Sequence, residues 1–196
     1  MIFKLGLKTG LDIGCGEGSP LTSVRGTGFK STGIEIDAKS IELARSKGLH
    51  DNYIFGDFMS VDLQRTFDVV VLSHVIEHFD RDLGWRVLQR LEQLNAHLIY
   101  VETPNGFFEQ ADYDGNPYQR HLSGWFPHDL QARGYTVFGS YPKWLAVPMG
   151  QRQVLPQFLR RALGRLLQWY YFRRPTKAAT IAGIRYRDRA GNLRAV

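Results

Sequence analysis

Residues 9–19 read TGLDIGCGEGS, a short apolar strand followed by glycines at positions 14, 16 and 18. Glycine adopts positive φ angles and lets a ligand approach the backbone closely. The spacing G-x-G-x-G differs from the dinucleotide motif G-x-G-x-x-G, which weighs against an NAD site, and no G-K-[ST] follows as in a P-loop. Taken alone, the stretch predicts a tight turn after a strand, and that turn is either structural or a ligand-binding loop.

Strand-like and helix-like patterns alternate around this turn. Apolar runs predict strands, while the helical period of apolar residues predicts helices over 38–48 and 80–94. Such alternation favours an α/β fold, with a parallel sheet covered by helices on both faces. Ligands of such sheets bind beyond the carboxyl ends of the strands, so the residues that follow each strand are the candidates for a site. The predicted strands are 9–15, 31–37, 52–57, 67–73, 97–104, 135–141 and 178–187.

The composition is that of a folded protein in a reducing compartment. The chain has 196 residues, is 43% hydrophobic and contains one cysteine, so it forms no internal disulfide. The length suits a single domain, 1–196. Neither a signal peptide nor an apolar run long enough to cross a bilayer is visible, so we expect this domain in the cytoplasm. The net charge of +6 is uneven, because residues 131–187 hold eleven Lys or Arg and no Asp or Glu.

Acidic residues follow the second and third predicted strands. Glu35 ends the second strand, where a carboxylate can accept hydrogen bonds from both hydroxyls of a ribose. Asp57 and Phe58 follow the third, where a carboxylate can accept from an adenine amino group and a ring can flank the base. Each residue alone suits a solvated strand end or a turn. Together with the glycine loop, they predict an adenosine pocket.

In this order the motifs resemble those of the class I S-adenosylmethionine-dependent methyltransferases, most closely the small-molecule, type 11/12-like branch. The resemblance implies a Rossmann-like three-layer sandwich, whose mainly parallel seven-stranded sheet ends in antiparallel geometry. It also implies S-adenosylmethionine as the cofactor and a small-molecule or lipid-linked methyl acceptor. The alternative is a catalytically inactive binding protein with the same fold. The matching stretches are LDIGCGEGS (11–19), GIEIDAKSIELAR (33–45), GDF (56–58), FDVVVLSHVIEHF (67–79), HLIYVETPNG (97–106) and residues 120–137.

The resemblance also implies which residues bind the cofactor. One group surrounds its methionine half, a second binds the ribose, a third contacts the adenine and a fourth passes near the sulfonium. In this order they are Asp12, Gly14, Cys15, Gly16 and Gly18; Glu35 and Ile36; Asp57 and Phe58; Ser73 and His74.

The stretch SHVIEH, residues 73–78, is close to the H-x-x-E-H pattern of some zinc peptidases. A catalytic zinc needs a third protein ligand. His121 or Glu102 is available, but nothing in the sequence points to either residue, so we predict no metal site. Two interpretations remain open. Either these side chains brace the loop, or one of them contacts the acceptor or removes its proton, a role that suits histidine near neutral pH. The candidate catalytic residues are His74, Glu77, His78 and His121.

A basic insert at about 143–176 departs from the family pattern. Within it, residues 156–174 have the periodicity of an amphipathic helix with arginines on one face. Three interpretations of this helix remain open: it covers the core or acceptor pocket, it lies on an anionic membrane, or it binds nucleic acid. Of the three, nucleic-acid binding is the least favoured. A second departure is that only about ten residues precede the glycine loop, so we expect a more exposed cofactor. The oligomeric state is left open.

Overall fold

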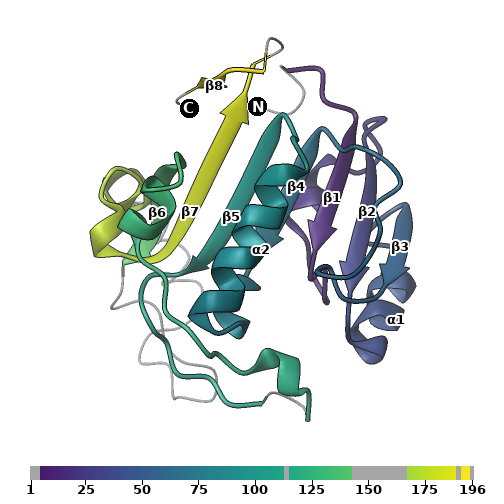
Figure 1. Ribbon diagram of the computed structural model, residues 1–196, viewed down its shortest axis with the longest axis horizontal. Coiled ribbons are helices and arrows are strands. Elements are labelled where there is room, and N and C mark those ends of the chain that lie inside the picture. The colour runs from purple at the N-terminus through teal and green to yellow at the C-terminus, as the bar shows by residue number, and fades with distance from the viewer. Residues whose placement is uncertain (1–4, 113–114, 143–166, 189–190, 195–196) are drawn as a thin grey trace.

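The computed structural model describes residues 5–112, 115–142, 167–188 and 191–194. Within these ranges the strands form one sheet in the order β3-β2-β1-β4-β5-β7-β6, with the short β8 added beside β7 (Figure 1). The first five strands run parallel to one another, and β7 lies antiparallel between β5 and β6. The predicted α/β fold, with its mainly parallel sheet and antiparallel end, is therefore confirmed. The strands are β1 (Thr9–Ile13), β2 (Lys30–Glu35), β3 (Asn52–Phe55), β4 (Val69–Ser73), β5 (Leu98–Pro104), β6 (Thr136–Pro142), β7 (Ala178–Arg187) and β8 (Leu193–Arg194).

Side chains point alternately to the two faces of β4, and both faces are buried, as its unbroken apolar run predicts. Val70 and Leu72 belong to an apolar cluster that includes residues of α2 (Arg81–Gln93) and α3 (Pro127–Gln131). Val69 and Val71 belong to a second cluster, which includes residues of the 3₁₀ helix η1 (Pro20–Val24). The central strand is thus held from both sides.

The helices begin where carboxylates can cap them. Asp37 accepts a hydrogen bond from the Ser40 N–H at the start of α1 (Ala38–Ser46), and Asp80 accepts one from the Leu83 N–H at the start of α2. Asp80 is therefore the cap of the second predicted helix. Because α1 begins directly after β2, this cap also fixes the path of the chain beyond Glu35.

Most of the predicted basic insert, residues 143–166, lies outside the described residues, and so does most of the predicted amphipathic helix. The described part begins at residue 167 and is helical through residue 172, followed by the 3₁₀ helix η5 (Pro175–Lys177). Among the described helices, none has both the length and the apolar character needed to cross a bilayer.

Candidate functional site

The carboxyl ends of β1, β2 and β4 bring the glycine loop, the end of β2 and the SHVIEH stretch to one edge of the sheet (Figure 1). Gly14 and Gly16 have φ angles of +66° and +42°, a region that disfavours residues with a Cβ atom. A Cβ at Gly14 would also lie 2.5 Å from a Val75 methyl group. Glycine is therefore required at position 14 by both conformation and space. Gly18 shows neither constraint.

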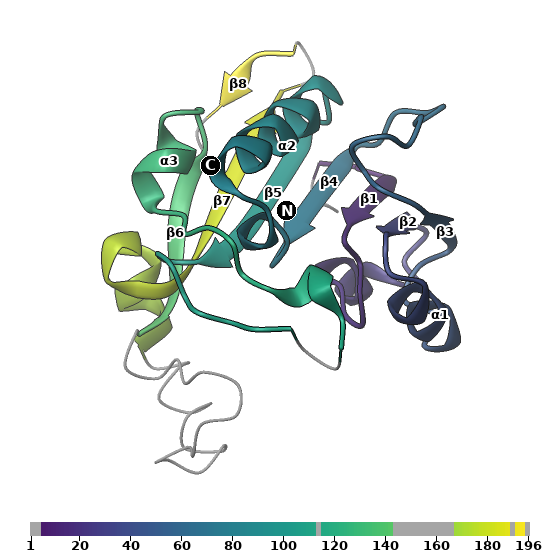
Figure 2. The same ribbon diagram turned by 60° about the horizontal axis from the view of Figure 1, so that its bottom comes forward.

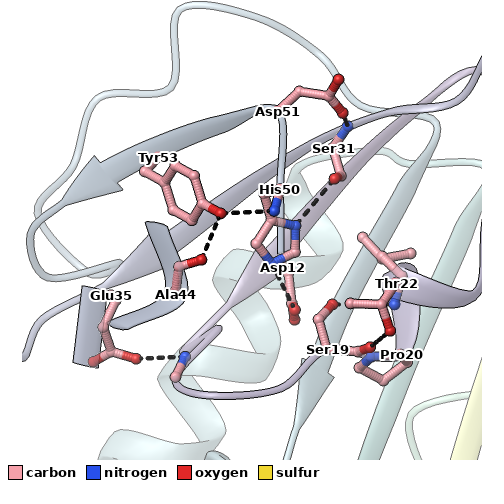
Figure 3. Close-up of polar contacts among 12 residues, drawn as sticks. Asp12, Ser19, Pro20, Thr22, Ser31, Glu35, Ala44, His50, Asp51 and Tyr53 are labelled. Atoms are coloured by element: carbon pink, nitrogen blue, oxygen red, sulfur yellow. Dashed lines mark hydrogen bonds and ion pairs between the residues drawn. The ribbon is translucent and has the colours of Figure 1, made fainter. Parts of the chain in front are cut away.

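Glu35, the predicted ribose ligand, also braces the glycine loop. Its side chain is buried, and one carboxylate oxygen accepts a hydrogen bond of 2.9 Å from the Gly16 N–H (Figure 3). The other oxygen accepts from the N–H groups of Ile36 and Asp37 at 2.8 and 2.9 Å. Each carboxylate oxygen has two lone pairs, so an acceptor remains for a ribose hydroxyl.

Ile36, predicted beside the ribose, and the two residues predicted to contact adenine, Asp57 and Phe58, differ in their surroundings. Ile36 is partly exposed at the edge of the sheet. Asp57 accepts a hydrogen bond of 2.8 Å from the Met59 N–H, which fixes the turn after β3. Phe58 is 5% exposed and belongs to the hydrophobic core, a placement that the sequence analysis did not anticipate. Of the three, Ile36 and Asp57 present the more accessible surface for a base.

Asp12 and Cys15 lie behind the loop in a buried cluster with His50. The nearest oxygen of Asp12 lies 3.4 Å from His50 Nε2, and His50 Nδ1 lies 3.0 Å from the Ser31 hydroxyl (Figure 3). This Asp12 oxygen accepts no hydrogen bond from the described residues. We therefore assign the ring proton of His50 to Nε2, where it faces the Asp12 oxygen. Nδ1 is then the acceptor, and the Ser31 hydroxyl donates to it. Burial raises the pKa of the Cys15 thiol to about 12, with Asp12 and Glu35 adding to the effect, so the thiol stays protonated and unreactive near neutral pH.

The SHVIEH stretch turns sharply at the end of β4. His74 has a φ angle of +54°, which is uncommon for a residue other than glycine, and its side chain remains half exposed. The Ser73 hydroxyl donates to Glu102 at 3.0 Å, and the His74 N–H donates to the Glu102 carbonyl oxygen at 2.8 Å. This turn places Val75 against Gly14, so His74 lies one residue from a direct contact with the glycine loop.

Glu77 is a buried carboxylate paired with His74. One of its oxygens lies 3.2 Å from His74 Nδ1, and the other accepts from the Thr103 hydroxyl at 3.0 Å. Burial disfavours the charged imidazole, but the hydrogen bond and charge of Glu77, with a contribution from Glu102, outweigh it and raise the pKa of His74. The pair engages Nδ1, and Nε2 of the His74 ring has no hydrogen-bond partner within the described part of the chain.

His121 comes to this site from the segment that follows β5. Its Nδ1 lies 2.6 Å from the Phe108 carbonyl oxygen, and Nδ1 of His78 lies 3.1 Å from the Arg120 carbonyl oxygen. A carbonyl only accepts, so both Nδ1 atoms carry a proton, and in the neutral form of each ring Nε2 carries the lone pair. Burial lowers the pKa of His121, which favours this neutral form.

Glu77, His78 and His121 each offer a ligand atom within 4.8 Å of the others. We call them the Glu–His–His trio. Imidazole nitrogens and a carboxylate oxygen are ligands of zinc and of other divalent transition metals, so the trio could hold such an ion. The predicted absence of a metal site therefore remains a prediction, and the structure brings His121 close enough to Glu77 and His78 for it to act as a third ligand.

A cavity of about 470 Å³ adjoins the glycine loop. One wall is formed by the loop and α1, and the opposite wall by the segment that follows β5. Neither that second wall nor His50 and Thr103 was identified from the sequence. The lining residues are Gly16, Glu17, Asp37, Lys39, Ser40 and Leu43 on the first wall, and Gln110, Gly115, Asn116, Pro117 and Gln119 on the second.

The sequence profile of a methyltransferase domain family matches residues 4–177. The chain belongs to this family. Membership makes S-adenosylmethionine the cofactor of the domain and methyl transfer its class of chemistry, which confirms both predictions at the level of the family.

Two of the individual proteins that resemble this methyltransferase domain share only 26% and 30% of their residues with it over the matched stretches. It is 30% identical over 100 residues to a ubiquinone biosynthesis O-methyltransferase of Rickettsia conorii, in a match that covers 49% of the chain and 32% of the relative. It is 26% identical over 103 residues to an uncharacterized methyltransferase of Alkaliphilus oremlandii, covering 53% and 48%. The chain thus spans a third to a half of the length of these curated relatives.

A solved structure supports the fold of the methyltransferase domain over nearly its whole length. A SAM-dependent methyltransferase from Archaeoglobus fulgidus superposes with a TM-score of 0.58 at 20% identity, covering 92% of this chain and 86% of that one. At such low identity the match concerns the fold alone.

Proposed function

We propose that the chain transfers the methyl group of S-adenosylmethionine to a hydroxyl of a small-molecule acceptor. The observation that carries this proposal is the His74–Glu77 pair, which lies one residue from the contact between Val75 and Gly14. Several relatives described as ubiquinone biosynthesis O-methyltransferases support a hydroxyl acceptor.

In this proposal the residues chiefly align the reactants. Methyl transfer from a sulfonium is a direct displacement, so acceptor oxygen, methyl carbon and leaving sulfur must lie in line. Glu35 and the glycine loop hold the cofactor, and His74 Nε2 accepts the proton of the acceptor hydroxyl. Glu77 fixes the orientation of the imidazole through Nδ1 and stabilises its charge after the proton has moved.

An assay of S-adenosylhomocysteine release with a panel of phenols and catechols tests this function. His74→Gln should lower kcat by roughly 10²–10⁴, the usual contribution of a general base, while the affinity for S-adenosylmethionine changes little. His128→Gln, at an exposed histidine on α3, is the matched control and should behave as the wild type. Turnover by the wild type with an unaffected His74→Gln variant would refute the base. Tight cofactor binding without turnover on any acceptor would favour the inactive binding protein.

We also propose that the basic segment contacts an anionic membrane, where it would give access to a lipid-linked form of such an acceptor. The described end of that segment supports this, because Trp169 is 69% exposed and the guanidinium groups of Arg173 and Arg174 lie over the rings of Trp169 and Tyr170 at 5.2 and 4.1 Å. Vesicles of phosphatidylserine should retain the protein at low salt and release it at high salt. Retention by neutral and anionic vesicles alike, independent of salt, would refute the electrostatic contact.

A further inference from the structure

The segment after β5 crosses the carboxyl edge of the sheet and reaches the region of β1 and α1 (Figure 2). We call its described parts, residues 107–112 and 115–122, the strap. It includes the 3₁₀ helix η3 (Pro117–Gln119). The cofactor residues assigned so far lie before position 75, so the strap is a separate part of the chain that reaches the same edge.

Burial indicates which side chains of the strap face inward. Gln110, Asn116 and Gln119 are partly buried, whereas the other described residues between positions 109 and 120 are exposed. All three line the cavity of about 470 Å³, opposite Gly16 and Asp37. This volume is within the usual range for small-molecule sites.

The opposite wall locates the cavity with respect to the cofactor. The N–H groups of Gly16 and Asp37 both donate to the carboxylate of Glu35, the proposed ribose ligand, at 2.9 Å. Glu35 does not line the cavity itself, but these two bonds place the wall that faces the strap amides directly beside the proposed ribose ligand. Amide groups both donate and accept, as ribose hydroxyls and an amino-acid carboxylate require of their partners.

Part of the hydrogen-bonding capacity of these amides is unused. Gln110 Nε2 donates to the Gln119 carbonyl oxygen at 2.7 Å, and Asn116 Oδ1 accepts from the Tyr118 N–H at 2.9 Å. Among the described residues, Gln110 Oε1 and Asn116 Nδ2 then have no hydrogen-bond partner, and neither has the side-chain amide of Gln119. Half-buried amides with free donors and acceptors along a cavity wall indicate a polar ligand.

The strap is also tied to two of the candidate catalytic residues, Glu77 and His121. The His121 N–H donates to the Gln110 carbonyl oxygen at 3.0 Å, and the Leu122 N–H donates to the Glu77 carbonyl oxygen at 2.8 Å. A ligand that holds the strap amides in place therefore also holds the backbone that carries His121.

We infer that the strap forms the outer wall of the S-adenosylmethionine site and binds the polar ribose end of the cofactor through Gln110, Asn116 and Gln119. This inference rests on the proposed function and adds ligand-binding residues that the glycine loop and strand ends do not supply. The arrangement makes cofactor binding depend on a segment that also carries His121.

Calorimetric titration with S-adenosylmethionine tests the strap. Gln119→Ala and Asn116→Ser should each weaken binding about 5-fold, and the double variant about 25-fold, because each loses one neutral hydrogen bond. Serine at position 116 still serves as a cap for η3, so the strap keeps its local fold. Gln89→Ala, at an exposed position on α2, is the matched control and should bind as the wild type does. The thermal midpoints of the free proteins should agree.

The outcomes separate the two proposals. If the wild type binds and Glu35→Ala weakens binding while the double strap variant binds normally, the strap inference is overturned and the proposed function stands. If the wild type does not bind S-adenosylmethionine, both are overturned. Weakening by the strap variants but not by Gln89→Ala supports the strap as a wall of the site.

Discussion

Replacing Glu35 by glutamine should destabilise the protein even when no cofactor is present. The carboxylate accepts three backbone hydrogen bonds of 2.8 to 2.9 Å, from Gly16, Ile36 and Asp37. Glutamine keeps one acceptor oxygen, which can serve Ile36 and Asp37, but its amide nitrogen then meets the Gly16 N–H, donor against donor. A hydrogen bond to a charged group contributes roughly 1.5–3 kcal/mol, and an unsatisfied buried donor costs a similar amount. We therefore expect a loss of about 2 kcal/mol in the free energy of unfolding.

Urea unfolding of the cofactor-free protein measures this loss, and Glu42→Gln is the control. Glu42 lies on α1 with its side chain 67% exposed and pairs only with Arg45 among the described residues, so its replacement should leave stability nearly unchanged. Titration with S-adenosylmethionine should show weaker binding for Glu35→Gln as well. An unfolding free energy equal to that of the wild type, with weakened binding, would show that Glu35 is a ligand residue that does not brace the loop.

Three further predictions concern the loop, the acid stability and the metal-binding capacity. Gly14→Ala should destabilise the fold by about 1–3 kcal/mol and abolish cofactor binding, because the new Cβ would overlap Val75 at a positive φ angle; unaltered calorimetric titrations would contradict this. Burial opposes ionisation of Asp129, but hydrogen bonds from Arg81 and a backbone N–H outweigh it and lower the pKa of Asp129 in the folded protein. The ionised carboxylate therefore stabilises the fold at pH values above the unfolded pKa of about 3.9. This stabilisation is lost as the pH falls through the lower folded pKa. Asp129→Asn should therefore flatten the loss of stability below about pH 4, and an unchanged acid-unfolding profile would contradict the pairing. If the Glu–His–His trio holds a divalent ion, zinc or manganese should raise the thermal midpoint of the wild type but not of His121→Ala, whereas equal midpoints with and without metal in the wild type would exclude it.

The sequence predicts the elements whose signals are local. The apolar run of β4 and the glycines after β1 each lie within a few consecutive residues, so the sequence alone predicted both the buried strand and the tight turn. The second role of Glu35 was not predicted, because the path of the backbone N–H groups around it depends on the packing of β1 against β2. Phe58 could not be placed in the core from sequence, since a single aromatic residue after a turn has no periodicity.

Contacts between distant segments escaped the sequence analysis for a different reason. His78 and His121 are separated by more than 40 positions, and their rings lie 4.9 Å apart only because the chain returns across the carboxyl edge after β5. No spacing rule links two such residues. The same holds for His50 and Asp12, which approach each other only through the pairing of β2 with its neighbours.

The backbone of His74 adds a conflict between folding and activity. Its φ angle of +54° is one that glycine would adopt at little cost, whereas an imidazole-bearing residue is held there at an expense of order 1 kcal/mol. Replacement by glycine would relax the backbone and remove the imidazole in the same step. Selecting variants of this protein for thermal resistance alone would therefore tend to remove the side chain that we propose as the catalytic base, and directed evolution for stability should screen turnover in parallel.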